Sequence, residues 1–196
     1  TGIVAKEAKD LINKIYKDGH EIACHYNYHD SIHKSSKSEF SYNLDKAIEY
    51  IFNATGVKPK GFRAPNFDIK PDDKWAYEEI AKRFEYDSSY ITNLPLTKIC
   101  PTSKMKFKNS VLKEFFIFSR SFLTKSFRLR SGGTFLKLFP VNLTIKTMKD
   151  CYEKGHYVIL YMHPYEFLKD GEFIIPFKDF YNYSFPKNII KYSRQI

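Results

Sequence analysis

A regular alternation of helical and strand-like patterns constrains the fold of this chain more than any other feature. Apolar residues recur at helical spacing over residues 3–17, and short apolar runs then alternate with helical stretches as far as residue 89. The short runs, expected to be strands, cover residues 21–24 and 61–63 and begin again at residue 86. Because such an alternation builds βα units, the sequence predicts an α/β fold with a parallel sheet or barrel and outer helices.

Capping signals mark the ends of these helices. Gly19 follows the first helix as a left-handed C-terminal residue. The stretch Ser36–Glu39 has the form of a capping box that opens the second helix, and Gly56 follows the end of that helix. The third helix begins after Pro71, and its buried stripe is expected to contain Trp75, Tyr77, Ile80, Ala81 and Phe84.

The alternation stops after residue 95. Residues 95–130 are interpreted as an insertion with one or two strands over 111–118. A clear helical pattern covers residues 141–154. A fully apolar strand is predicted over residues 157–162, and it ends directly before His163.

Composition and charge indicate a globular domain. The hydrophobic content is 43%, and we expect one domain over residues 1–196 with no membrane span, because no apolar run approaches roughly 18 residues. The net charge of +10 is concentrated in residues 97–130, where nine basic side chains accompany one acid, Glu114. This segment is either a solvated face or an attractor of acidic polymers. No nucleic-acid motif accompanies it, so we expect no nucleic-acid partner.

The three cysteines, Cys24, Cys100 and Cys151, show no metal-binding spacing and are odd in number. They are therefore interpreted as buried free thiols rather than as a zinc site or a disulfide framework.

Two histidines with three residues between them follow the first predicted strand. Neutral imidazole is the commonest protein metal ligand, so His25 and His29 at a strand end can hold one divalent cation. The alternative is that both rings only hydrogen-bond to the backbone. His33 continues the spacing but falls in an expected loop, and we assign it no role.

Other polar residues occupy the same topological position. Arg63, Asp87 and His163 each follow or end a short apolar run. Functional residues of α/β folds gather at the carboxyl ends of parallel strands. The sequence therefore predicts that these three side chains meet His25 and His29 in one cleft.

The segments around these residues resemble the NodB-like polysaccharide deacetylases, carbohydrate esterase family 4. The resembling segments follow the family's order: residues 19–29, 61–66 (GFRAPN), 84–89 (FEYDSS), 131–140 (SGGTFLKLFP) and 160–166 (LYMHPYE). The resemblance implies a distorted (β/α) barrel. It also implies metal-assisted removal of acetyl groups from an N-acetylated polysaccharide or a glycan precursor.

The resemblance assigns the metal and the proton donor. His25 and His29 correspond to two of the three protein ligands of a divalent cation, for which Zn²⁺ is the default, although imidazole also suits iron, cobalt and nickel. His163 corresponds to the histidine that protonates the leaving amine.

The resemblance further assigns residues that bind and orient the substrate. The backbone N–H of Asn66 would help to bind the oxyanion, and Arg63, paired with Asp87, would orient the charged groups of the site. The acyl or sugar pocket would be lined by Pro65, Phe67 and Tyr165.

One motif of the family has no counterpart in this chain. The family's first motif is an Asp-rich strand end that supplies the base and the third metal ligand. Asp10 and Asp18 lie on or beside the first predicted helix, and Asp30 adjoins His29, so none follows an N-terminal strand. We therefore expect a C-terminal portion of a deacetylase, with a barrel incomplete at its N-terminus and little or no activity of its own.

Two other functions fit the same residues. The chain is alternatively a catalytically inactive glycan-binding relative that keeps the groove without the chemistry. It is also compatible with a cyclic amide hydrolase of the same superfamily.

Overall fold

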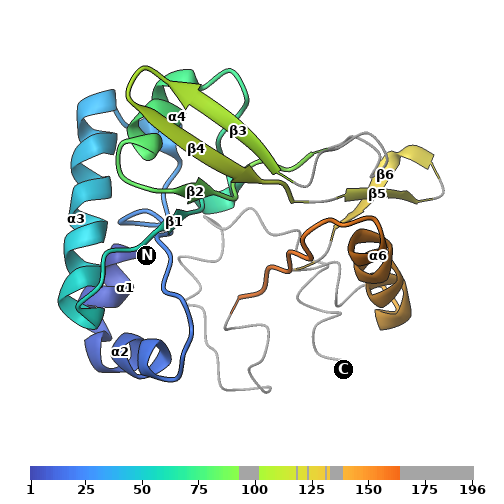
Figure 1. Cartoon of the computed structure of the whole chain (residues 1–196), viewed down its shortest axis with the longest axis horizontal. Helices are drawn as coiled ribbons and strands as arrows, with labels where there is room; N and C mark the ends of the chain where they lie inside the picture. The colour runs from blue at the N-terminus through green and yellow to red at the C-terminus, as the bar shows by residue number, and fades with distance from the viewer. Residues whose placement is uncertain (93–101, 118, 123, 131, 133–138, 164–196) are drawn as a thin grey trace, which may run out of the picture. The chain divides into compact units, whose positions relative to one another are not determined.

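The computed structural model describes residues 1–92, 102–117, 119–122, 124–130, 132 and 139–163 (Figure 1). The contacts divide the chain into two compact units: residues 1–92 with 99–117, and residues 93–98 with 118–196. That these units together form the single domain expected over residues 1–196 stays a prediction.

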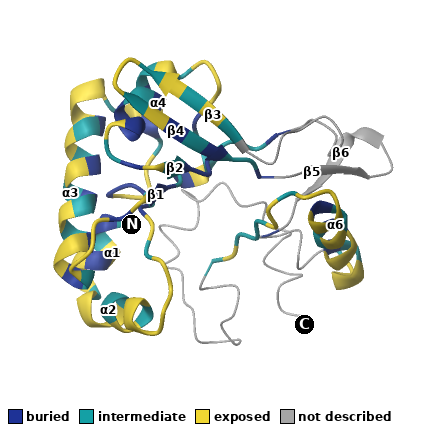
Figure 2. Cartoon of the chain, viewed as in Figure 1, coloured by how far each residue is buried: buried dark blue, intermediate teal, exposed yellow. Residues whose placement is uncertain are grey.

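The N-terminal helix predicted over residues 3–17 is in fact two helices. These are α1 (Gly2–Glu7) and α2 (Lys9–Lys17). Ala8 leaves the helical conformation with φ −117° and ψ 44°. Because of this break, the apolar residues before and after Ala8 do not lie on one continuous helix face. Val4 and Leu11 are exposed as a result, whereas α1 packs through Gly2 and Ala5. Figure 2 shows that α2 contributes no buried residue.

Helix α3 (Lys37–Thr55) has the predicted ends. The Ser36 hydroxyl accepts a hydrogen bond from the Glu39 N–H at 3.2 Å. Gly56 ends the helix with φ 77°, a left-handed conformation that favours glycine. The buried face of α3 consists of Phe40, Leu44, Ala47, Ile51 and Ala54.

Helix α4 (Lys74–Ala81) confirms most of the predicted stripe. Tyr77, Ile80 and Ala81 are buried, and Phe84 is buried just beyond the helix. Trp75 is only partly buried and packs edge-on against Phe40, with ring centroids 5.4 Å apart.

A four-stranded sheet in the order β1-β2-β4-β3 completes the first unit (Figure 1). The strands are β1 (Gly61–Phe62), β2 (Tyr86–Asp87), β3 (Thr102–Phe107) and β4 (Ser110–Phe115). β1, β2 and β4 are parallel, and β3 is antiparallel to β4. The predicted parallel α/β arrangement is thus confirmed, and the hairpin expected in an insertion belongs to the main sheet. The described sheet is open, so closure into a distorted barrel stays a prediction.

The strand predicted over residues 21–24 is wrong. Cys24 alone pairs with Phe62, because its N–H donates to the Gly61 carbonyl and its carbonyl accepts from the Arg63 N–H. The neighbouring strand β1 has only two residues and offers no further partners. A single parallel bridge therefore holds the start of the histidine segment to the sheet.

The second unit contains the hairpin β5 (Ser119–Phe122) and β6 (Thr124–Arg130) and the helix α6 (Val141–Glu153), which confirms the helix predicted over residues 141–154. The apolar strand predicted over residues 157–162 is wrong. Within the described residues that segment makes one isolated bridge, between Tyr161 and Gly132, and Tyr157 and Met162 are exposed. An apolar run forms a strand only where a neighbouring strand pairs with it. In the described part of the chain, the bridge to Gly132 is the only such pairing.

Cys24 and Cys151 are buried and take part in no disulfide, as predicted, while Cys100 lies outside the described residues. No helix in the described part of the chain combines the length and the apolar character needed to cross a bilayer.

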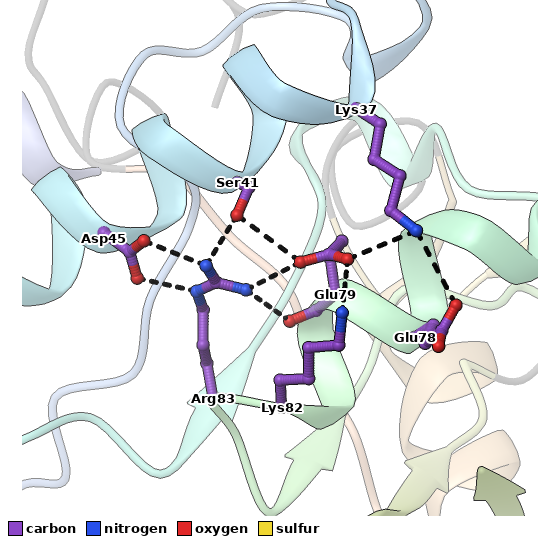
Figure 3. Close-up of polar contacts among 7 residues, drawn as sticks. All are labelled: Lys37, Ser41, Asp45, Glu78, Glu79, Lys82 and Arg83. Carbon is purple, nitrogen blue, oxygen red and sulfur yellow. Dashed lines mark hydrogen bonds and ion pairs between the residues drawn. The ribbon is translucent and has the colours of Figure 1, made fainter. Parts of the chain in front are cut away.

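A polar network joins α3 to α4 around Glu79 (Figure 3). Arg83 donates to both carboxylate oxygens of Asp45, at 2.6 and 2.9 Å, and to Glu79 Oε2 at 3.0 Å. Lys82 donates to Glu79 Oε1 at 2.7 Å. Burial alone would raise the pKa of Glu79, but the hydrogen bonds from Lys82 and Arg83 outweigh it and lower that pKa to about 2.

We expect Arg83→Ala to lower the free energy of unfolding by about 2 kcal/mol, because the buried Glu79 loses one of its cationic donors and Asp45 loses its two hydrogen bonds from Arg83. Urea unfolding measures this change. The control is Lys14→Ala, which removes an exposed ion pair with Asp18 and should change stability by less than about 0.5 kcal/mol. Since the folded-state pKa of Glu79 is lowered, the network's contribution should be present above about pH 4.5 and be lost as the pH falls towards 2. Equal effects of the two substitutions would contradict this account.

Candidate functional site

The structure brings the two predicted metal ligands together. The ring centroids of His25 and His29 are 5.2 Å apart, with the rings inclined at 66°. His25 is half-buried beside the sheet and His29 is exposed. His33, to which the sequence assigns no role, lies 3.5 Å from carboxylate oxygens of Asp68 and Asp73.

One nitrogen of the His25 ring hydrogen-bonds to the backbone, and the other can act as a metal ligand. Its Nδ1 lies 2.7 Å from the Arg63 carbonyl oxygen, so a proton on Nδ1 donates to that carbonyl and leaves a lone pair on Nε2. Burial lowers the pKa of His25 to about 4, which keeps the ring neutral at neutral pH. The backbone hydrogen bond of His25 therefore leaves both interpretations of the HxxxH spacing open, because one ring can bond to the backbone through Nδ1 and bind a cation through Nε2.

The segment between the histidines is anchored in the core. Tyr26 is buried, stacks on Phe40 with centroids 5.3 Å apart, and has a left-handed φ of 61°. The carbonyls of Tyr26 and Asn27 accept hydrogen bonds from the Gly2 and Ile3 N–H groups at the start of α1. Sequence reasoning missed this anchor, because a tyrosine carries no signal of a left-handed conformation.

Arg63 is held by the segment after β2. Its Nε donates to the Ser88 carbonyl and its Nη2 to the Ser88 hydroxyl, both at 3.0 Å. The guanidinium carbon also lies 5.8 Å from the centre of the Phe67 ring. Among the described residues Arg63 forms no ion pair with Asp87, so the expected pairing is electrostatic only: burial lowers the pKa of Arg63 and Asp87 opposes that shift.

Asp87 is fully buried and supports the turn after Arg63. It accepts hydrogen bonds from the Ser89 N–H at 2.9 Å and from the Ser89 hydroxyl at 2.6 Å. The same Ser89 hydroxyl accepts from the Ala64 N–H at 2.8 Å. Asp87 thus acts on the GFRAPN segment through Ser89.

The proposed oxyanion donor lies in that turn. Residues Pro65–Phe67 form a 3-10 turn, in which Asn66 is exposed and has a left-handed φ of 56°. Within the described residues the Asn66 N–H has no protein acceptor. Pro65 is buried and Phe67 half-buried, so both lie at the same turn as the candidate donor.

The remaining assignments stay predictions. His163 belongs to the second unit, and Tyr165 lies outside the described residues. Over the described ranges there is no group of three His, Cys, Asp or Glu side chains that could hold a metal ion. The candidate site in the first unit therefore consists of the imidazole pair, Arg63, and the hydrogen bonds by which Asp87 and Ser89 hold the turn after Arg63.

Comparison with known families identifies two successive stretches. Residues 1–87 match the polysaccharide deacetylase family, and residues 86–184 match a domain of unknown function, DUF3473. Residues 1–87 belong to the polysaccharide deacetylase family. The resemblance drawn from the motifs is thus confirmed. His25, His29 and Arg63 lie in the deacetylase stretch, and His163 lies in the DUF3473 stretch.

Two individual relatives each match only part of this chain. The uncharacterized protein YlxY of Bacillus subtilis (strain 168) is 45% identical over 56 residues, which are 29% of this chain and 18% of that protein. A solved structure from Mycobacterium smegmatis, assigned to the polysaccharide deacetylases, is 24% identical with a TM-score of 0.50, over 59% of this chain and 38% of that one. This second likeness bears on the fold alone. The chain spans less than half the length of both relatives.

The polysaccharide deacetylase Bc1974 of Bacillus cereus is 16% identical, over 90% of this chain and 81% of its own, with a TM-score of 0.41. That TM-score is too low to establish a shared fold.

Proposed function

We propose that this chain contributes to metal-dependent hydrolysis of N-acetyl groups on an amino-sugar polysaccharide or its precursor. The observation that carries the proposal is the imidazole pair of His25 and His29, whose ring centroids are 5.2 Å apart. Membership of the polysaccharide deacetylase family supports a hydrolase that acts on amides.

The donor chemistry of the pair fits a divalent cation, for which we propose Zn²⁺. His25 Nδ1 faces a backbone carbonyl, the arrangement by which metal-binding histidines are usually oriented. When bound, such a cation polarises the amide carbonyl and lowers the pKa of water from about 15.7 towards about 7. Two imidazoles hold a cation less tightly than the three protein ligands of a typical catalytic zinc site.

The other residues of the proposed site bind and orient the substrate. The Asn66 N–H would donate to the oxyanion, a contact worth roughly 3 kcal/mol in comparable sites. Pro65 and Phe67 would line the acyl pocket beside it, and Arg63 would fix the turn that presents the donor. The leaving amine needs a proton, and we propose His163 as the donor, with Tyr165 as a contact to the sugar.

Zinc binding and acetate release test this proposal together. We expect His25→Ala and His29→Ala to weaken Zn²⁺ binding to the chain by about tenfold or more. In a longer protein that contains this chain, we also expect acetate release from N-acetylglucosamine oligomers to require added metal and to fall with both substitutions. The matched control is His20→Ala, because His20 is an exposed histidine five positions before His25. Zn²⁺ binding unchanged in His25→Ala would refute the metal site.

One observation favours a second candidate, a glycan-binding relative without chemistry: no third ligand accompanies the imidazole pair among the described residues. If the oligomers bind but release no acetate with any divalent metal, in this chain or in a longer protein that contains it, the binding function is correct. Full turnover by the 196-residue chain would contradict the expectation of little activity.

A further inference from the structure

Glu114 is buried beside Asp87 in the sheet, although no sequence motif includes it. The two residues are register partners on the parallel strands β4 and β2, and their exposed fractions are 1% and 0%. Two carboxyl groups buried side by side do not both ionise, because water cannot screen their repulsion. The pair therefore keeps one proton at pH values at which an exposed carboxyl group has lost its own.

The surrounding donors assign this proton to Glu114. Asp87 accepts two hydrogen bonds from Ser89, which favour its ionised form. Glu114 Oε1 accepts from the Tyr90 N–H at 3.0 Å, whereas its buried Oε2 has no donor among the described residues. An ionised Oε2 would be buried without a donor, but a protonated one can itself donate. In agreement, burial and the charge of Asp87 raise the pKa of Glu114 to about 10.

The groups around the pair leave the cluster neutral. Arg63, directly after β1, interacts electrostatically with both carboxyl groups, and each of them raises the pKa of its guanidinium. On α4 the facing titratable group is Tyr77, whose pKa is raised by burial and then by Glu114. On β3 the register partner of Glu114 is Ser103, which does not titrate. With one proton on the pair, a single negative charge balances the charge of Arg63.

Strand β4 also fastens the segment that holds Arg63. Glu114 binds the Tyr90 N–H, and the Phe115 carbonyl accepts from the Ser88 hydroxyl at 3.0 Å. The same Ser88 hydroxyl accepts a hydrogen bond from Arg63 Nη2. Residues 88–90, which lie in the DUF3473 stretch, are therefore held by β4 while they position the turn after Arg63 in the deacetylase stretch.

We propose that Glu114 is a positioning residue of the site: its protonated carboxyl group holds Asp87 and the Tyr90 N–H, and so keeps residues 88–90 where they position Arg63 and Ala64. Strand β4, which lies in the DUF3473 stretch, would then help to position residues of the candidate site. The inference rests on the proposed function only in treating Arg63 as part of an active site.

Amide hydrogen exchange in Glu114→Gln and Glu114→Leu tests the proposal on the 196-residue chain. Glutamine keeps an acceptor for Tyr90 and a donor for Asp87, so protection of the Ala64 and Tyr90 amides should stay within about threefold of wild type. Leucine has a similar volume but neither group, and protection of both amides should fall by at least about tenfold. Equal protection in the two variants would reduce Glu114 to a packing residue and overturn the proposal.

The pH dependence of unfolding gives a second test that needs only the wild type and Glu114→Gln. The unfolded state loses the Glu114 proton near pH 4.5, whereas burial and the charge of Asp87 make the folded state keep it to a much higher pH. The unfolding equilibrium constant of the wild type should therefore rise by up to about tenfold per pH unit above pH 4.5, until the folded state also loses the proton. Glutamine should remove this rise, and an identical pH dependence in both proteins would overturn the proposal. Neither measurement uses turnover, so a failure here is distinct from an absence of deacetylase activity.

Discussion

Phe40→Ala should lower the free energy of unfolding by about 3–5 kcal/mol, the largest stability effect that we expect from a single substitution in this chain. Phe40 has no exposed surface, and its ring packs against both Tyr26 and Trp75, with centroids 5.3 and 5.4 Å away. Alanine would leave a cavity that the surrounding helices can fill only in part. Urea unfolding measures the change.

The same substitution should also weaken Zn²⁺ binding by about tenfold. The left-handed backbone of Tyr26 costs roughly 1–2 kcal/mol relative to an ordinary conformation, and the stacking on Phe40 compensates for it. Once this stacking is lost, the segment between His25 and His29 can relax and separate the rings. Zinc titration under conditions in which the variant stays folded measures this second effect.

Phe52 provides the matched control, because it is a phenylalanine on the same helix with 45% of its surface exposed. Phe52→Ala should change the free energy of unfolding by less than about 0.5 kcal/mol. If the two alanine variants have the same stability, or if Phe40→Ala binds zinc as the wild type does, the proposed anchoring of the histidine segment is wrong.

In a longer protein that contains this chain, Arg63→Leu should lower kcat/KM for acetate release by about a hundredfold, because it displaces the turn that presents the Asn66 N–H. It should also lower the free energy of unfolding by about 2 kcal/mol, since the carbonyl and hydroxyl of Ser88 lose their donor. Without the cation, the buried Asp87 would have no balancing charge. Steady-state kinetics and urea unfolding measure the two effects separately.

Arg63→Lys should recover only part of the loss. Lysine keeps the charge but cannot reproduce the two directed hydrogen bonds from Nε and Nη2 to Ser88. Lys60→Leu is the control, because Lys60 is an exposed cation three positions away, and it should leave both measurements near wild type. Full recovery with lysine would show that charge alone matters at this position.

The sequence predicted those features that depend on local chemistry or on a family motif. The capping box at Ser36 depends on residues three apart, and the meeting of His25 with His29 depends on a spacing of four. The order of the motifs along the chain is sufficient to indicate the family. Each of these signals lies within one short segment.

The failed predictions concern longer-range packing. Ala8 has a high helix propensity, and nothing in its neighbourhood announces the break between α1 and α2. The apolar run at residues 157–162 has strand character, but whether a run becomes a strand depends on a partner supplied from elsewhere in the chain. Glu114 stands out in the sequence only as the one acid of a basic segment, because its burial follows from register with Asp87.

The two-residue strand Tyr86–Asp87 lies where the two family matches meet. It is bonded on one side to Gly61–Phe62 and on the other to Lys113–Glu114. A polypeptide that ended at that junction would lack β4, the neighbour of β2 on one side. It would also lose Leu112 of β4 from the buried core. The border between the two families is therefore not a border between independently folding pieces, and a version of the first unit made for study should extend through residue 117.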